Sequence, residues 1–208
     1  MLRPLIVASL PILRREDLKK VQDVDADFVE LRLDYLRERV EPTELAYLKG
    51  KVIVTLRDRN EGGVGNIDHD EKEAFLKKLF DLGVMYDVEE SFLRKRKVPY
   101  EGQVVSAHYF SRLPDKEEVD QIFSRFKQAY TVKVAVSNLP GYRETLAYIS
   151  EKPNATFMPM NVKPMERLAF ALLGSKLLYT YVEAPTAQGQ MNYKEAKRLL
   201  DFLFENGK

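Results

Sequence analysis

The sequence predicts an α/β fold in which short buried strands alternate with amphipathic helices along the whole chain. The first observation behind this prediction is a series of eight short runs rich in apolar and β-branched residues, which have the length of strands. These runs are Leu5–Pro11, Phe28–Asp34, Val52–Arg57, Val84–Val88, Gln103–His108, Tyr130–Val136, Ala155–Met160 and Leu177–Val182. The second observation is the helical spacing of apolar residues in the segments that follow five of these runs. The helical segments are Asp70–Leu82, Lys116–Ala129, Tyr142–Ile149, Pro164–Leu173 and Tyr193–Phe204.

Strands that are apolar throughout are typical of parallel sheets covered by helices on both faces. The 208 residues leave about 26 for each of eight strand–helix units, which is tight but sufficient for a compact (β/α)8 TIM barrel. An open, doubly wound sheet is the alternative. Ser9-Leu10-Pro11 ends the first strand in place of a glycine-rich phosphate-binding turn, which disfavours the dinucleotide-binding form of that alternative. We therefore expect residues 1–208 to form a single barrel domain.

The segment Asp70–Leu82 shows how the helices are defined. Its apolar residues fall on one face, and its lysines lie mostly elsewhere. We expect Asp68 or Asp70 to cap the start of this helix and Gly83 to end it.

The composition excludes several classes of protein. Lysine and arginine number 33 against 32 aspartates and glutamates, a net charge of +1, so nothing suggests binding to nucleic acid. The chain has no cysteine and 2 histidines, which leaves no disulfide and too few ligands for a dedicated zinc site. The apolar run near the N-terminus is too short for a signal peptide, and no stretch approaches the roughly 18 apolar residues of a membrane span. We therefore expect a soluble, cytoplasmic protein.

Lys133 is the most unusual residue of the chain, because it lies in the middle of the apolar run Tyr130–Val136. Burying an unpaired ammonium group is strongly unfavourable, which leaves two interpretations. In the first, the run is an edge strand and Lys133 faces water. In the second, Lys133 is buried with a lowered pKa, and its amine can attack a carbonyl carbon to form an imine.

Polar residues gather at the C-terminal ends of the predicted strands, where barrel enzymes carry their chemistry. At the end of the second strand, Glu30, Arg32 and Asp34 share one face because strand side chains alternate. Glu30 and Arg32 can pair with each other, or they can bind a polyhydroxylated ligand. Arg57 ends the third strand, ahead of a loop at residues 61–65 whose glycines we expect to be mobile enough to cover a ligand.

His108, at the C-terminal end of the fifth strand, is the better placed of the two histidines for proton transfer. His69 stands where a helix is expected to start, and we interpret it as solvent-exposed. Because the fifth and sixth strands are neighbours, we expect His108 and Lys133 to face one cavity. An imine acidifies a neighbouring C–H bond, and a general acid/base beside the imine can move the proton of that bond. Arg57 and Arg167 would hold a carboxylate and help to lower the pKa of the lysine.

With these residues in place, the sequence resembles the type I 3-dehydroquinate dehydratases, the Schiff-base enzymes of the shikimate pathway. The resemblance covers essentially the whole chain and rests on the order and spacing of short motifs that are weak one by one. The motifs are Glu30-Leu-Arg32-Leu-Asp34, Thr55-Leu-Arg57, Glu61-Gly-Gly63, Ser106-Ala-His108-Tyr-Phe110, Lys133-Val-Ala-Val136, Met158-Pro-Met160, Arg167, Leu173-Gly-Ser175 and Ala187-Gln-Gly-Gln190.

The resemblance implies a (β/α)8 barrel lyase that acts on 3-dehydroquinate with no metal and no dissociable cofactor, and that forms a homodimer. Lys133 would form the imine with the C3 ketone. His108 would remove a C2 proton and then protonate the departing C1 hydroxyl, giving 3-dehydroshikimate by syn elimination. Glu61 would orient and tune His108 through a hydrogen bond.

The resemblance also implies which residues bind the substrate. Arg167 would hold the carboxylate, and Thr186 and Gln190 would close over it from the loop after the eighth strand. The other implied pocket residues are Ser9, Glu30, Arg32 and Arg57 near the ring hydroxyls and the carbonyl, with Phe110, Met158 and Met160 as walls. For each methionine, ordinary core packing is the alternative.

The sequence departs from the family pattern in four places. Tyr109 follows the implied catalytic histidine where an aspartate is usual, and Glu166 precedes Arg167 where a serine is common. The usual Ser-Ala-Pro-Gly-Gln loop reads Thr186-Ala-Gln-Gly-Gln190. The first strand starts almost at residue 1, so we expect no N-terminal hairpin capping the bottom of the barrel.

Two other functions are compatible with the same residues. The first is another Schiff-base barrel enzyme, such as an aldolase that acts on a different hydroxyketone. Such enzymes often bind phosphate near the seventh and eighth strands, where this sequence has Arg167 and Gln190 but no glycine-rich turn. The second is a non-catalytic barrel that binds a small polar anion or serves as an interaction domain.

Overall fold

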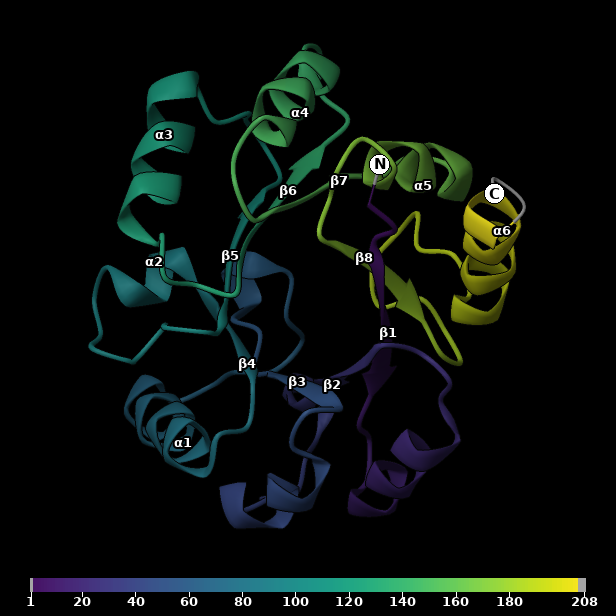
Figure 1. Ribbon diagram of the computed structural model, residues 1–208. Helices are drawn as coiled ribbons and strands as arrows, with labels where there is room; N and C mark the ends of the chain where they lie inside the picture. The colour runs from purple at the N-terminus through teal and green to yellow at the C-terminus, as the bar shows by residue number, and fades with distance from the viewer. Residues whose placement is uncertain (1, 206–208) are drawn as a thin grey trace.

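Eight parallel strands lie at the centre of the computed structural model, which describes residues 2–205 (Figure 1). The strands are β1 (Leu5–Pro11), β2 (Phe28–Arg32), β3 (Val52–Thr55), β4 (Tyr86–Glu89), β5 (Val104–Tyr109), β6 (Thr131–Ser137), β7 (Ala155–Met160) and β8 (Leu177–Tyr181). Each strand pairs with its neighbour in sequence, and β1 also pairs with β8. This order is that of a (β/α)8 barrel, so the doubly wound alternative is wrong.

The barrel closes at a seam between β7 and β8, which lie against each other without a regular hydrogen-bonded ladder. Ser175 spans this seam. Its hydroxyl accepts a hydrogen bond from the Phe157 N–H at 3.1 Å and donates one to the Leu177 carbonyl at 2.9 Å. The Lys176 N–H adds a bond to the Ala155 carbonyl at 2.8 Å. A single hydroxyl thus satisfies backbone groups on both strands.

Helices surround the strands (Figure 1). The connections after β3, β5, β6, β7 and β8 are α-helical as predicted, and a short helix after β4 was not predicted. The α-helices are α1 (His69–Leu82), α2 (Glu90–Leu93), α3 (Lys116–Arg125), α4 (Tyr142–Ser150), α5 (Pro164–Ala171) and α6 (Tyr193–Glu205). The connections after β1 and β2 are 3₁₀-helical instead, in η1 (Arg15–Asp23) and η3 (Pro42–Leu48). Two further 3₁₀ turns are η2 (Leu33–Tyr35) and η4 (Arg59–Glu61). None of the described helices is long and apolar enough to cross a membrane.

Helix α1 begins and ends where its capping residues predict. An Asp68 side-chain oxygen accepts hydrogen bonds from the Asp70 and Glu71 N–H groups at 2.8 and 3.0 Å. Gly83 ends the helix at φ +69°, in the left-handed region. Lys72 is an exception to the amphipathic pattern, because it is buried on the inner side of the helix.

The barrel interior has an apolar floor below a polar mouth. Side chains alternate along each strand, so inward positions recur every second residue. On β1, inward Val7 is followed by Ser9, and on β3, inward Ile53 is followed by Thr55. Val7 and Ile53 belong to the apolar cluster that fills the floor, whereas a second, larger cluster packs the strands against the helices. The polar residues therefore gather at the C-terminal ends of the strands.

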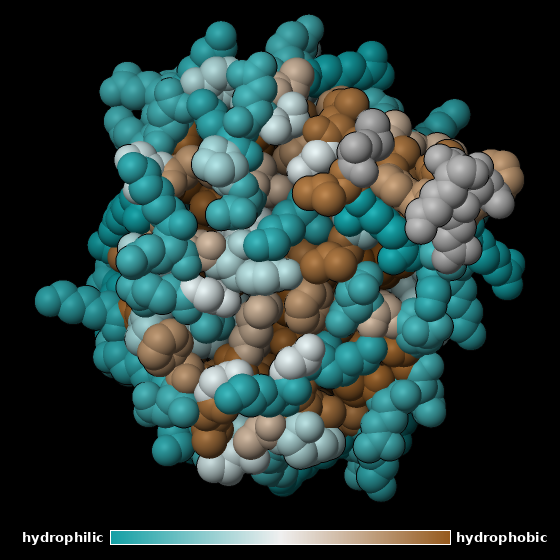
Figure 2. Space-filling model, viewed as in Figure 1, coloured by the Kyte–Doolittle hydropathy of each residue, from teal (hydrophilic) through white to brown (hydrophobic). Residues whose placement is uncertain are grey.

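Hydrophilic residues cover much of the periphery of the molecule, and hydrophobic residues are visible toward the middle of the face in view (Figure 2). In the described part of the chain, only residues 2–4 precede β1, and they form no hairpin. Arg3 pairs with Asp201 of α6 at 2.6 Å, which holds the start of the chain against the last helix.

Candidate active site

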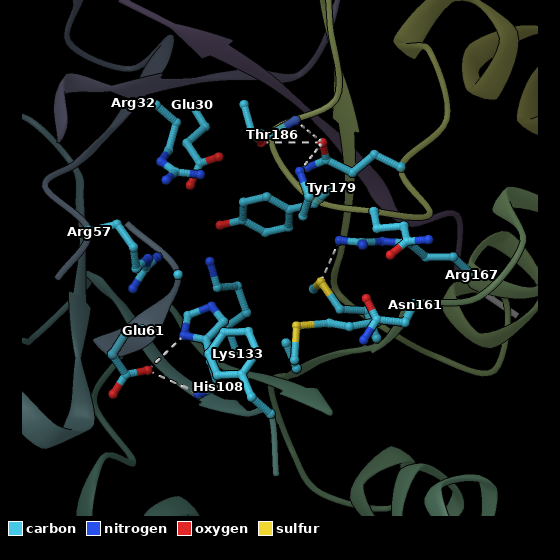
Figure 3. Close-up of a pocket in the computed structure, with 18 residues that line it drawn as sticks. Glu30, Arg32, Arg57, Glu61, His108, Lys133, Asn161, Arg167, Tyr179 and Thr186 are labelled. Carbon is cyan, nitrogen blue, oxygen red and sulfur yellow. Dashed lines mark hydrogen bonds and ion pairs between the residues drawn. The ribbon is translucent and has the colours of Figure 1, made fainter. Parts of the chain in front are cut away.

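A cavity of about 190 Å³ opens at the C-terminal ends of the strands. Figure 3 shows charged and aromatic side chains from several strands converging on it. The residues expected from the sequence that line it are Glu30, Arg32, Arg57, Glu61, His108, Phe110, Lys133, Met158, Met160, Arg167, Thr186 and Gln190. Ser9 lies beneath the cavity and contacts it through Glu30. His69 lies outside it, half-exposed at the start of α1, as the sequence predicted.

Lys133 is buried inside the barrel, with 4% of the residue exposed. Its strand pairs with β5 on one side and β7 on the other, so the edge-strand interpretation is wrong. The amine donates a hydrogen bond to Asp87 Oδ2 at 2.5 Å and lies 4.3 Å from the centre of the Tyr179 ring. Burial lowers the pKa of Lys133, and the cation of Arg57 lowers it further against the opposing pull of Asp87.

Asp87 and Glu89, at the end of β4, were not identified from the sequence. Both are buried, and both hold Arg57, whose guanidinium lies 2.8 Å from Asp87 and 3.2 Å from Glu89. Arg57 also donates to the Ser106 hydroxyl at 2.7 Å, which in turn donates to Asp87 at 2.5 Å. Burial alone would raise the pKa of Asp87, but Arg57 and Lys133 together hold it well below its usual range.

This cluster corrects the expected role of Arg57. The sequence predicted that Arg57, with Arg167, would hold a carboxylate and help to lower the pKa of Lys133. The structure shows Arg57 already paired with two carboxylates of the protein, so its position agrees only with the second part of that prediction. The missed signal was the alternation in Tyr86-Asp87-Val88-Glu89, which places both acids on the inward face of one strand. The predicted strand ended at Val88, so Glu89 was left outside it.

His108 lies two residues beyond Ser106, the residue of β5 that stands opposite Lys133. Its Nδ1 lies 2.9 Å from Glu61 Oε2, and its backbone N–H donates to the same oxygen at 3.2 Å. Glu61 is in turn held by the Ser91 hydroxyl at 2.6 Å. Because Nδ1–H donates to the carboxylate, Nε2 keeps its lone pair. Figure 3 shows the imidazole beside the Lys133 side chain in the same cavity.

The protonation state of His108 is set by its surroundings. Burial and the nearby cations Arg57 and Lys133 lower the pKa of His108 to about 4, although Glu61 opposes this shift. The imidazole is therefore neutral at neutral pH and can accept a proton. The pKa of Glu61 is lowered because His108, Ser91 and Arg57 outweigh the effect of burial, so Glu61 remains a carboxylate.

Glu30 and Arg32 line the mouth but do not pair with each other in the structure. Glu30 accepts hydrogen bonds from the Ser9 hydroxyl at 2.5 Å and the Thr55 hydroxyl at 2.9 Å. Arg32 forms a two-point pair with Asp34, at 2.8 and 2.7 Å. The ion pair considered from the sequence is therefore replaced by an Arg32–Asp34 pair, formed where the chain turns into η2.

Arg167, on α5, is the cation in the cavity that lacks a carboxylate partner among the described residues. It is buried, and its Nη2 lies 2.9 Å from Met158 Sδ. Its Nε and Nη1 make no hydrogen bond to any described group of the protein. Burial lowers the pKa of Arg167 to about 10, so it remains charged at neutral pH. Such a guanidinium is suited to a two-point interaction with an anionic ligand.

The loop after β8 is held together by Gln190. Its side-chain oxygen accepts hydrogen bonds from the Thr186 and Ala187 N–H groups at 2.7 and 3.1 Å. Its Nε2 lies 3.5 Å from the Ser9 hydroxyl. Gly189 has φ +85°, and a Cβ there would lie 2.6 Å from the Val162 carbonyl oxygen, so only glycine allows this close approach.

Comparisons with known proteins agree with this geometry. The sequence model of the family described as type I 3-dehydroquinase matches residues 6–139. A 3-dehydroquinate dehydratase of Metallosphaera sedula is 60% identical, covering 97% of this chain and 99% of that protein. One from Saccharolobus solfataricus is 45% identical, covering 97% and 96%. The chain belongs to the type I 3-dehydroquinase family.

The solved structures that resemble this member of the family share its fold. The 3-dehydroquinate dehydratase of Geobacillus kaustophilus superposes with a TM-score of 0.74 at 22% identity, covering 99% of this chain and 93% of that one. A type I 3-dehydroquinate dehydratase from Clostridium difficile, solved with covalently modified comenic acid, gives a TM-score of 0.71 at 23% identity, covering 99% and 94%.

Two of the departures from the family pattern, Tyr109 and Glu166, lie outside the cavity, whereas Gln188 lines it. Tyr109 donates a hydrogen bond from its hydroxyl to Glu118 of α3 at 2.9 Å and does not line the cavity. Glu166 pairs with Arg143 of α4 at 3.1 Å and accepts a hydrogen bond from the Tyr142 hydroxyl. Glu166 is therefore held on the side of α5 away from the cavity, and it does not pair with Arg167.

Proposed function

We propose that the protein eliminates water from 3-dehydroquinate to give 3-dehydroshikimate through a Schiff base on Lys133, the third step of the shikimate pathway. One observation carries this proposal. A buried amine with a lowered pKa and an imidazole with a free Nε2 face the same cavity, in a chain that belongs to the type I 3-dehydroquinase family.

Lys133 supplies the electron sink. Its neutral amine attacks the C3 ketone, and loss of one water gives an iminium. The positive nitrogen then draws electrons from the neighbouring carbon and acidifies the C2 proton. At the end of the reaction, water hydrolyses the imine and restores the amine, so one water is lost overall.

His108 moves the proton. Its Nε2 takes the C2 proton to leave an enamine, and the same nitrogen then protonates the C1 hydroxyl as it departs as water. Glu61, 2.9 Å from Nδ1, orients the ring and stabilises the imidazolium between these two steps. The low pKa of His108 favours prompt return of the proton to the leaving group.

The remaining residues of the site hold the substrate. Arg167 binds the carboxylate with the nitrogens that have no partner among the described groups. Thr186 and Gln190 close over the carboxylate from the loop after β8, with Phe110, Met158 and Met160 as walls. Glu30, Arg32 and Arg57 face the ring hydroxyls and the carbonyl carbon, and Ser9 supports Glu30 from below.

Reduction with borohydride tests the proposal directly. In the presence of 3-dehydroquinate, borohydride should convert the imine into a stable secondary amine, which peptide mass mapping should locate on Lys133. Lys72, which is also buried, lies in an ion pair with Glu89 at 2.6 Å and should carry no adduct. Lys133→Ala should lose both the adduct and the turnover. Adduct formation on a different lysine, or turnover by Lys133→Ala, would exclude this chemistry.

We also propose that the protein works in the cytoplasm as a homodimer. A step in the synthesis of aromatic amino acids supports the first part. The second is supported by exposed apolar residues on α6, where Phe202 and Leu203 are 67% and 48% exposed. Sedimentation should give a dimer that Phe202→Glu weakens. A monomer at micromolar concentration would contradict the proposed dimer. Cell fractionation tests the cytoplasmic location.

A further inference from the structure

Tyr179 carries a buried hydroxyl that the described part of the protein leaves without a hydrogen-bond partner. The residue lies in the middle of β8, is 3% exposed, and lines the cavity. Its hydroxyl makes no hydrogen bond to any described group of the protein. The neighbouring hydroxyls of Ser9, Thr55 and Ser106 are all bonded to carboxylates.

A phenylalanine would fill the same space without burying an unpaired oxygen. The Tyr179 ring packs with the apolar floor of the barrel, among residues such as Val7 and Leu177. An unpaired buried hydroxyl is unfavourable, whereas the ring alone would satisfy this packing. Figure 3 shows the hydroxyl pointing across the cavity, toward the wall that carries Arg57 and away from Arg167. A ligand that enters the cavity can therefore provide its hydrogen-bond partner.

We propose that the Tyr179 hydroxyl hydrogen-bonds the C4 hydroxyl of the substrate ring, which makes Tyr179 a further substrate-binding residue. This inference rests on the proposed function. It adds a contact on the side of the ring opposite the carboxylate, where the chain offers a neutral donor among charged groups.

The position of C4 in the substrate ring makes its hydroxyl the partner expected for Tyr179. In the six-membered ring, C4 lies across from C1, the carbon that bears the carboxylate, and next to C3, the carbon that Lys133 attacks. With the carboxylate on Arg167, C4 lies toward the opposite wall. The Lys133 amine lies 4.3 Å from the centre of the Tyr179 ring, so a substrate bonded to that amine has C4 within the reach of the phenol.

The protonation state of Tyr179 suits this role. Burial, with Asp87 and Glu30 nearby, raises its pKa well above the usual value. The phenol therefore keeps its proton and can donate a hydrogen bond throughout the pH range of activity. The face of its ring is also turned to the Lys133 nitrogen, where it favours the cationic imine over the neutral one.

Tyr179→Phe tests the hydroxyl while it keeps the ring. With 3-dehydroquinate, kcat/KM should fall about 3- to 10-fold, as expected for the loss of one neutral hydrogen bond. With the 4-deoxy analogue of 3-dehydroquinate, the parent protein and Tyr179→Phe should have the same kcat/KM. An equal fall for both substrates, or no fall with 3-dehydroquinate, would overturn the proposal.

Two further measurements distinguish a substrate contact from a structural role of the Tyr179 hydroxyl. Tyr179→Phe should unfold at the same or a higher temperature than the parent protein, because the hydroxyl bonds no described protein group. A lower unfolding temperature would indicate a structural role and overturn the proposal. Borohydride should still trap the adduct on Lys133 in Tyr179→Phe. Absence of the adduct from the parent protein as well would refute the proposed function itself.

Discussion

The reactivity of Lys133 depends on how one carboxylate is divided between two cations. A lysine paired with Asp87 alone would be held as an ammonium group, because a buried ion pair favours both charged forms. Arg57 competes for the same carboxylate at 2.8 Å, against 2.5 Å for Lys133. Since arginine keeps its proton, the excess positive charge beside Asp87 can be reduced only by deprotonation of Lys133. Arg57 therefore tunes the nucleophile, as the sequence predicted, through a carboxylate that the sequence analysis did not identify.

Asp87→Asn should therefore shift the pH dependence of the enzyme. Asp87 opposes the lowering of the Lys133 pKa by burial and by Arg57, so its removal lowers that pKa further. The amine then stays neutral to lower pH, and the acidic limb of the kcat/KM profile should move to lower pH. Glu89→Gln is the matched control, because Glu89 contacts Arg57 and Lys72 but not Lys133. A shift of the acidic limb to higher pH in Asp87→Asn would contradict this account.

Some residues of the site could be predicted because their type is unusual for their position, whereas Tyr179, which is of an ordinary type for a strand, could not. Lys133 was conspicuous in an apolar run, and His108 was found because it ends a strand. Tyr179 lies in the run Leu177–Tyr181, where a tyrosine looks like core packing. Whether the polar end of such a side chain has a partner depends on residues from other strands, which the local sequence does not contain.

At the scale of elements, the loop at residues 61–65, which contains three glycines, positions Glu61 by close packing. A Cβ on Gly63 would lie 1.9 Å from the Arg57 carbonyl oxygen, so no other residue can occupy this position without moving the backbone. Gly63 N–H also bonds the Asp58 carbonyl at 3.0 Å. The loop therefore joins the end of β3 to the carboxylate that holds His108. Its glycines were expected to provide mobility, and the structure assigns Gly63 a packing role.

Gly63→Ala should consequently impair catalysis through Glu61. Displacing the loop lengthens the Glu61–His108 hydrogen bond, and we expect kcat to fall about 100-fold, the loss expected when a group of the site is misplaced by about 1 Å. Gly50→Ala is the control, because Gly50 has φ +81° but open space around its Cβ position. It should lower the free energy of unfolding by about 1 kcal/mol and leave kcat unchanged. Equal kcat values for the two variants would show that the loop packing does not set the position of Glu61.

The strands and most α-helices were predictable from local periodicity, but the first two connections of the barrel were not. In η1 the buried residues Leu18 and Val21 are three apart, and in η3 Pro42, Leu45 and Leu48 repeat the same interval. A period of three matches the three residues per turn of a 3₁₀-helix rather than the 3.6 of an α-helix. Because an interval of three residues also occurs in α-helices, so short a pattern does not identify a 3₁₀-helix from the sequence alone.

For the whole molecule, the closed barrel keeps the reacting groups away from water, and this has a consequence for stability. The same burial that keeps His108 neutral makes the folded protein a poorer proton acceptor than the unfolded chain. In the unfolded chain a histidine titrates near pH 6.5, whereas burial, with the help of Arg57 and Lys133, lowers the pKa of His108 to about 4. Between these values the unfolded state binds a proton that the folded state does not.

The free energy of unfolding should therefore fall as the pH is lowered from about 6.5 to about 4, with His108 contributing roughly 3 kcal/mol at full extent. His108→Gln removes this contribution, so its stability should fall less over that interval. Urea unfolding at a series of pH values measures the difference, and His69→Gln, which alters the half-exposed histidine outside the cavity, should behave like the parent protein. Parallel curves for the parent and His108→Gln would mean that the imidazole is not held neutral by burial, and that its readiness to accept the C2 proton has another origin.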